Sequence, residues 1–128
     1  MNSLIIDATN KITFFMIINN NDIYNVSHEN SKTNYERLFI LLKDFLNSKN
    51  FTFGDISRLY VNGGPGSFGG IRNSISMVKA IHLAKNIDYY CYSLTKFKKE
   101  DDIKYENIPN LCDKFNVKKN LINPIYIS

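Results

Sequence analysis

The chain has 128 residues, a length typical of one domain, and its 44% hydrophobic residues are typical of a folded protein. The net charge of +4 comes mainly from lysines scattered along the chain, without the basic run that a dedicated nucleic-acid groove favours. No apolar stretch approaches a membrane span and no secretion signal opens the chain, so we expect no membrane contact and a cytoplasmic location.

The first predicted elements are three strands, over residues 3–7, 11–18 and 22–26. The second strand is rich in isoleucine, threonine and phenylalanine. The asparagines at 19–21 favour a turn, because asparagine tolerates positive φ. The opening is therefore predicted to be an antiparallel meander.

A helix is predicted next, beginning at the capping box Thr33-x-x-Glu36 and ending at residues 47–50. Its apolar side chains fall within an arc of roughly 160°, wider than the ~100° that a core-facing helix needs. A second helix, over residues 71–85, has a comparably broad apolar arc.

Strands are predicted at residues 56–61 and 87–93, on either side of a glycine-rich turn and the second helix. The order β-β-β-α-β-α-β indicates an α/β fold with a mixed sheet and helices packed on it. Residues 96–102 are charged and are predicted to form a loop. After them we expect only a short helix or a terminal strand at residues 125–127.

Cysteine and histidine give no metal pattern. Cys91 lies in an apolar run, Cys112 has no C-x-x-C partner, and neither His28 nor His82 has a ligand-like neighbour. We therefore expect no metal site.

The glycine-rich turn, residues 63–70, allows several interpretations. Its Gly64-x-Gly66-x-x-Gly69 spacing matches a dinucleotide loop. The acid that such a loop needs at the end of the next strand is not there, because Asp88 precedes the strand residues Tyr89–Tyr92. A P-loop would need a lysine after the last glycine, and a nucleophile elbow at Ser67 would need glycine in place of Pro65. A rigid structural turn remains the fourth interpretation.

The turn also closely resembles a family signature. Gly64-Pro65-Gly66-Ser67-Phe68-x-Gly70-Ile71-Arg72 is similar to the Gly-Pro-Gly-Ser-Phe-Thr-Gly-Val/Leu-Arg motif of TsaB (YeaZ) proteins. Weaker likenesses lie at residues 6–9, 55–61, 79–84, 93–94 and 124–126. The chain departs from the family at Gly69, which replaces threonine, and at Asn34-Tyr35-Glu36, which replaces a common His-Ser-Glu.

The resemblance implies an actin-like (ASKHA, ribonuclease H-like) N-terminal domain over residues 1–95, followed by a short remnant of a second domain at residues 96–128. Active members of this superfamily bind ATP between two domains. With one wall of that cleft, the chain is expected to bind no cofactor alone, and ATP and metal are expected in its partner. Asp7 corresponds to the acid of the first phosphate loop, but no glycine follows it nearby, which indicates a degenerate site without catalytic residues.

The function implied is that of a non-catalytic partner subunit. TsaB proteins pair with a larger subunit, TsaD, which transfers threonylcarbamoyl to an adenosine beside the anticodon of transfer RNA, and a small ATPase, TsaE, assists. Contact with transfer RNA is expected to be indirect, and a homodimer is possible in isolation. Two alternatives are a stand-alone nucleotide-binding protein that uses the glycine loop and a decayed homodimeric interaction module.

Pairing in the family uses the two helices of the first domain. The predicted partner-binding residues are the apolar side chains of the two broad arcs, namely Leu38, Leu41, Leu42, Phe45, Ile71, Ile75, Met77 and Val78. On this basis Leu38→Asp or Phe45→Asp is expected to weaken partner binding. The residues alone leave open the alternative that both arcs are buried within the chain itself.

Overall fold

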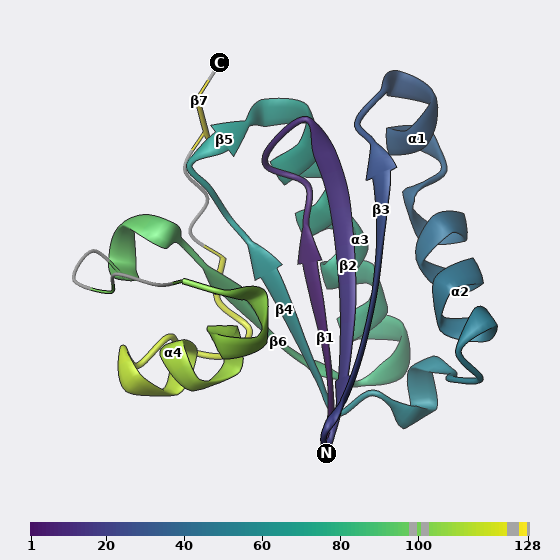
Figure 1. The fold of residues 1–128 in the computed structure, drawn as a ribbon. Helices are drawn as coiled ribbons and strands as arrows, with labels where there is room; N and C mark the ends of the chain where they lie inside the picture. The colour runs from purple at the N-terminus through teal and green to yellow at the C-terminus, as the bar shows by residue number, and fades with distance from the viewer. Residues whose placement is uncertain (98–99, 101–102, 123–125, 128) are drawn as a thin grey trace.

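Five strands form one mixed sheet in the order β3-β2-β1-β4-β6 (Figure 1). The structure, a computed structural model, describes residues 1–97, 100, 103–122 and 126–127. The five strands are β1 (Asn2–Asp7), β2 (Ile12–Asn19), β3 (Asp22–Glu29), β4 (Arg58–Asn62) and β6 (Asp88–Tyr92). The first three form the predicted antiparallel meander, and β4 and β6 run parallel to β1. The predicted fold class is therefore confirmed.

Two helices cover one face of this sheet. They are α2 (Leu38–Ser48) and α3 (Phe68–Lys85), which lie behind and beside the strands in Figure 1. Alternate residues of the central strands, such as Leu4, Ile6 and Phe15, pack beneath them in one core. Because side chains along a strand alternate between faces, the intervening residues belong to a second core on the opposite face.

The first helix differs from the prediction. It is divided at Arg37 into the short α1 (Lys32–Glu36) and α2, and its cap is Ser31 instead of Thr33. Ser31 has an extended backbone, so its hydroxyl reaches back to accept from the N–H of Asn34 at 3.1 Å. A capping box does occur, but between Thr52 and Asp55 at the 3₁₀ turn η1 (Phe53–Asp55).

The second helix begins earlier than predicted. The end of the glycine-rich turn is already helical from Phe68, because the Ser67 side chain accepts from the N–H of Gly70 and so caps the first turn. Asn86 ends the helix in the left-handed conformation, with φ 55°. In the part of the chain described by the structure, no helix is long and apolar enough to cross a membrane.

The described part of residues 96–128, called the tail below, covers the second face of the sheet. After the 3₁₀ turns η2 (Leu94–Phe97) and η3 (Tyr105–Asn107), helix α4 (Ile108–Lys114) packs against the strands. Phe97, Ile108 and Leu111 share the second core with Tyr60 and Tyr92. The expected short helix is thus present, but it is joined to the sheet through a common core.

The expected terminal strand is also present. It is β7 (Tyr126–Ile127), which pairs in parallel with β5 (Gly66–Ser67) of the glycine-rich turn. Residues 98–99 and 101–102 of the predicted charged loop lie outside the described residues. The same holds for Pro124 of the terminal family likeness and for the first residue of the predicted strand, Ile125.

Candidate functional site

Three polar side chains form a row at the carboxyl ends of the parallel strands. Asp7 ends β1, Asn62 ends β4 and Tyr92 ends β6. The register pairs Asn62 with Tyr92 and Ile6 with Val61, which puts Asp7 beside Asn62. The carboxyl edge of parallel strands is where open α/β sheets bind ligands. This row is therefore the candidate site.

The Asp7 carboxylate is buried and fully hydrogen-bonded. Its Oδ1 accepts from the N–H of Thr9 at 2.9 Å and from the Thr9 hydroxyl at 2.7 Å. Its Oδ2 accepts from the Asn62 amide at 3.0 Å and from the Tyr105 hydroxyl at 2.8 Å. Two carboxylate oxygens accept about four hydrogen bonds, so their capacity is used within the chain.

Tyr105 attaches the tail to this site. Its ring stacks on Phe14 with centroids 4.1 Å apart, while its hydroxyl donates to Asp7. Burial, followed by the charge of Asp7 and this hydrogen bond, raises the pKa of Tyr105 far above its usual value, so it remains a donor. Sequence reasoning missed Tyr105, because a residue 98 positions from Asp7 in a weakly patterned tail gives no local signal.

Two glycines of the family loop bring it against the turn after β1. A Cβ at Gly70 would lie 1.7 Å from the carbonyl oxygen of Ala8, and a Cβ at Gly66 would lie 2.4 Å from that of Thr9. Both distances are far inside van der Waals contact. Glycine is therefore required for this close approach of two backbones.

Most N–H groups of the loop are already engaged. The N–H of Gly63 donates to Tyr92 O at 2.7 Å, that of Gly64 to Asn62 Oδ1 at 2.9 Å, and that of Ser67 to Thr9 O at 2.9 Å. Phosphate-binding loops direct such groups at the ligand. With the Asp7 oxygens also occupied, these residues do not fit the magnesium–nucleotide group of the actin-like superfamily, and the loop serves to join two segments.

The remaining family-loop residues reach the surface. Pro65 follows Gly64 through a cis peptide bond and is half-buried. Phe68 and Arg72 are exposed on the first turns of α3, with the Arg72 guanidinium 5.7 Å from the centre of the Phe68 ring. This cation–π pair is the part of the loop most accessible to another molecule.

The two departures from the family motif lie in contact. A Cβ at Gly69 would be 3.2 Å from the Tyr35 ring, so that ring occupies the space that a side chain at position 69 would need. Tyr35 stands where the family commonly has serine, and Gly69 stands where it has threonine. The larger residue at one position therefore compensates for the smaller residue at the other.

Most of the predicted partner-binding residues belong to the core. Leu38, Leu42, Phe45, Ile71, Ile75, Met77 and Val78 are buried, and Leu41 is half-buried. These side chains are therefore not a surface, because they pack against the sheet and the neighbouring helix. The large apolar side chains that α2 and α3 expose are instead Phe39 (47% exposed), Ile40 (50%), Phe68 (48%) and Leu83 (80%).

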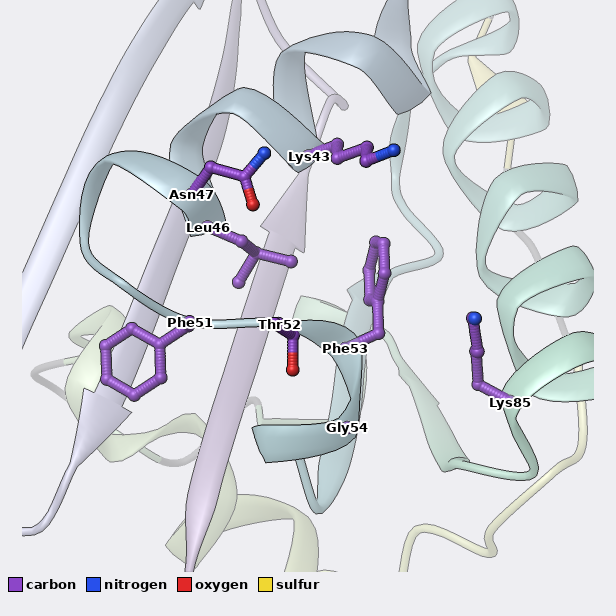
Figure 2. Close-up of a pocket in the computed structure, with 8 residues that line it drawn as sticks. All are labelled: Lys43, Leu46, Asn47, Phe51, Thr52, Phe53, Gly54 and Lys85. Atoms are coloured by element: carbon purple, nitrogen blue, oxygen red, sulfur yellow. The ribbon is translucent and has the colours of Figure 1, made fainter.

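A hollow of about 300 Å³ lies between the C-terminal ends of α2 and α3 (Figure 2). Its floor is apolar, from Leu46, Phe51 and Phe53, and Lys43 and Lys85 flank it. None of the described residues that line it is acidic. The hollow therefore suits a group that combines an apolar body with negative charge.

The five-stranded mixed sheet, with its meander and two α–β units, defines an actin-like or ribonuclease H-like domain. YeaZ from Pseudomonas aeruginosa superposes with a TM-score of 0.66 at 17% identity, over 72% of this chain and 43% of that chain. Thermus thermophilus RuvC superposes with a TM-score of 0.54 at 10% identity, over 92% of this chain and 82% of that chain. These similarities show the fold, and this chain spans less than half of YeaZ.

Residues 26–94, just over half of the chain, match the family model of TsaD, described as tRNA N6-adenosine threonylcarbamoyltransferase. The chain therefore belongs to this family, in agreement with its TsaB-like motif. A comparison with curated proteins finds no match. No three His, Cys, Asp or Glu residues gather as metal ligands within the described residues.

Proposed function

We propose that the chain is a non-catalytic, TsaB-type subunit that binds TsaD and supports threonylcarbamoyl transfer to transfer RNA. The observation that carries the proposal is the state of the family's phosphate-loop region. Asp7 and most N–H groups of the glycine loop are committed to internal hydrogen bonds. A chain whose acid and most loop N–H groups are bonded internally contributes to the reaction by binding its partner.

The partner surface is assigned to the outward sides of α2 and α3. Phe39 and Ile40 on α2 and Leu83 on α3 expose large apolar side chains. The lysine-flanked hollow of Figure 2 lies between the same helices and fits an acidic residue of the partner. Apolar anchors with a charged rim are the usual composition of protein interfaces. Contacts with TsaE and indirect contact with transfer RNA stay predictions.

A matched pair of variants tests this surface. Ile40 on α2 and Ile12 on β2 are 50% and 51% exposed, so aspartate at either position costs the fold a similar amount. Ile40→Asp is expected to weaken binding to TsaD at least about tenfold, equivalent to ~1.4 kcal/mol, while Ile12→Asp leaves it unchanged. Isothermal titration calorimetry with purified TsaD measures both. Equal affinities for the two variants contradict the surface assignment.

Core substitutions cannot test the surface. Leu38→Asp and Phe45→Asp would each place a carboxylate in the core between α2 and the sheet. We expect both variants to unfold, and circular dichroism distinguishes that outcome from a specific loss of binding. If either variant folds normally and still fails to bind TsaD, the buried residues do reach the partner.

A further inference from the structure

A cavity of about 180 Å³ lies on the tail side of the candidate site. It is lined by Asp7, Tyr92, Leu94, Ile103, Tyr105 and Ile108. Two of these residues end the parallel strands β1 and β6, so the cavity has the position of a ligand site in an α/β sheet. The tail supplies its remaining wall.

Among the residues that the structure describes, none is a hydrogen-bond partner of the Tyr92 hydroxyl. The residue is 1% exposed, so bulk water does not satisfy this group. Tyr92, Asp7 and Tyr105 line the same cavity, and burial, followed by the negative charge of Asp7, raises the pKa of Tyr92. Buried hydroxyls in folded proteins are normally satisfied by protein, water or ligand.

The cavity also carries a negative charge without a counter-ion. All four donors to Asp7 are neutral, and Asp7 forms no ion pair with any described residue. Lys11 lines a neighbouring hollow with Asp7 but is itself exposed to solvent. Buried charges are usually paired, so a positively charged ligand would complete this site.

The acceptors are arranged for such a ligand. Tyr105 gives its proton to Asp7, which leaves its oxygen lone pairs free to accept, and the Tyr92 oxygen is free as well. The rings of both tyrosines add aromatic surface that favours a cation. The other walls, Leu94, Ile103 and Ile108, are aliphatic and suit a hydrocarbon chain.

We propose that this cavity binds a small primary ammonium with a short aliphatic body. The ammonium donates to the Tyr92 oxygen and to the Tyr105 oxygen, and the nearby Asp7 carboxylate, whose own hydrogen bonds are made within the chain, supplies the opposite charge. A cavity of ~150 Å³ holds a six-carbon ring, so the larger volume here has room for a body of about four carbons together with its ammonium group. A hydrated divalent cation does not match the three aliphatic walls, and Asp7 repels an anion.

The test titrates the full chain with n-butylammonium, followed by ¹H–¹⁵N NMR. Butan-1-ol and butanoate, of the same chain length, are the neutral and anionic controls. We expect saturable shifts at Asp7, Tyr92 and Tyr105 with butylammonium, at least tenfold weaker binding of the alcohol and none of butanoate. The absence of saturation, or equal affinity for amine and alcohol, would overturn the proposal.

Tyr92→Phe isolates the hydroxyl, because it keeps the ring and removes only a group without a partner. We expect it to fold with an equal or higher melting temperature and to bind butylammonium about tenfold more weakly. Tyr60→Phe is the control, since Tyr60 is also 1% exposed but does not line the cavity. If Tyr92→Phe binds like the wild type, or Tyr60→Phe weakens binding equally, the cavity assignment is wrong.

Discussion

The closest backbone approach at the site gives the sharpest test of the structure. In Gly70→Ala, the new methyl group would lie 1.7 Å from the carbonyl oxygen of Ala8. Carbon–oxygen contacts normally begin near ~3.3 Å, so the backbones must separate by about 1.6 Å. This obstacle cannot rotate away, because it is backbone. The change therefore disturbs both the first turn of α3 and the end of β1.

The size of the effect follows from two opposing contributions. Overpacking of this kind lowers the free energy of unfolding by ~3 kcal/mol or more, and the better helix propensity of alanine raises it by at most ~1 kcal/mol. A net loss of ~2–3 kcal/mol is a large part of the 5–15 kcal/mol by which domains are stable. With an unfolding entropy of ~2.1 cal/mol/K per residue, the melting temperature should fall by about 7–11 °C.

Urea denaturation of the wild type, Gly70→Ala and Gly54→Ala measures this effect. Gly54 is the control, because a Cβ there would meet only Thr52 Oγ1 at an ordinary 3.5 Å. Its free energy of unfolding should change by less than ~0.5 kcal/mol. If Gly70→Ala is as stable as Gly54→Ala, the loop does not pack on the turn after β1 as described.

Three further predictions concern single contacts. Gly69→Thr should destabilise the chain by ~1 kcal/mol, and adding Tyr35→Ser should restore most of it; additive losses in the double-mutant cycle would contradict the compensation. Burial raises the pKa of the Cys112 thiol from 9.0 to about 12. The unfolded chain therefore loses this proton first as the pH rises past 9, and stability should fall by ~1 kcal/mol between pH 8 and 10. Cys112→Ala should remove that part of the slope in urea titrations, and an unchanged slope would refute it. Ser67→Ala should cost ~0.5–1 kcal/mol through loss of the α3 cap, and unchanged stability by the same assay would show that the cap is unimportant.

Local patterns were sufficient to predict the sheet. The β-branched and aromatic composition of β2, the asparagine turn and the two broad apolar helices predicted the element order, because each depends on near neighbours in sequence. Asn20 does adopt a positive φ of 55° at the first turn. The helix start at Ser31 was missed, since Thr33 and Glu36 form an equally good capping pattern in sequence.

Long-range contacts could not be predicted in this way. The width of the apolar arcs was attributed to a partner surface, whereas residues such as Leu42 and Ile71 serve the chain's own core. A broad apolar arc looks the same in sequence whether it contacts a partner or the chain's own core, because the pattern shows only that the helix has many apolar residues. The hydrogen bond from Tyr105 to Asp7 joins the tail to the first strand. Neither segment has a sequence pattern that indicates contact with the other.

The central claim is that this chain completes a TsaD partner instead of reacting alone. The most direct measurement mixes purified chain with TsaD from the same organism, adds transfer RNA and the threonylcarbamoyl donor, and quantifies the modified adenosine by nucleoside mass spectrometry. We predict a stable complex whose activity far exceeds that of TsaD alone, and no product from the chain alone. Unchanged TsaD activity without a complex, or product formed by the chain alone, would contradict this account.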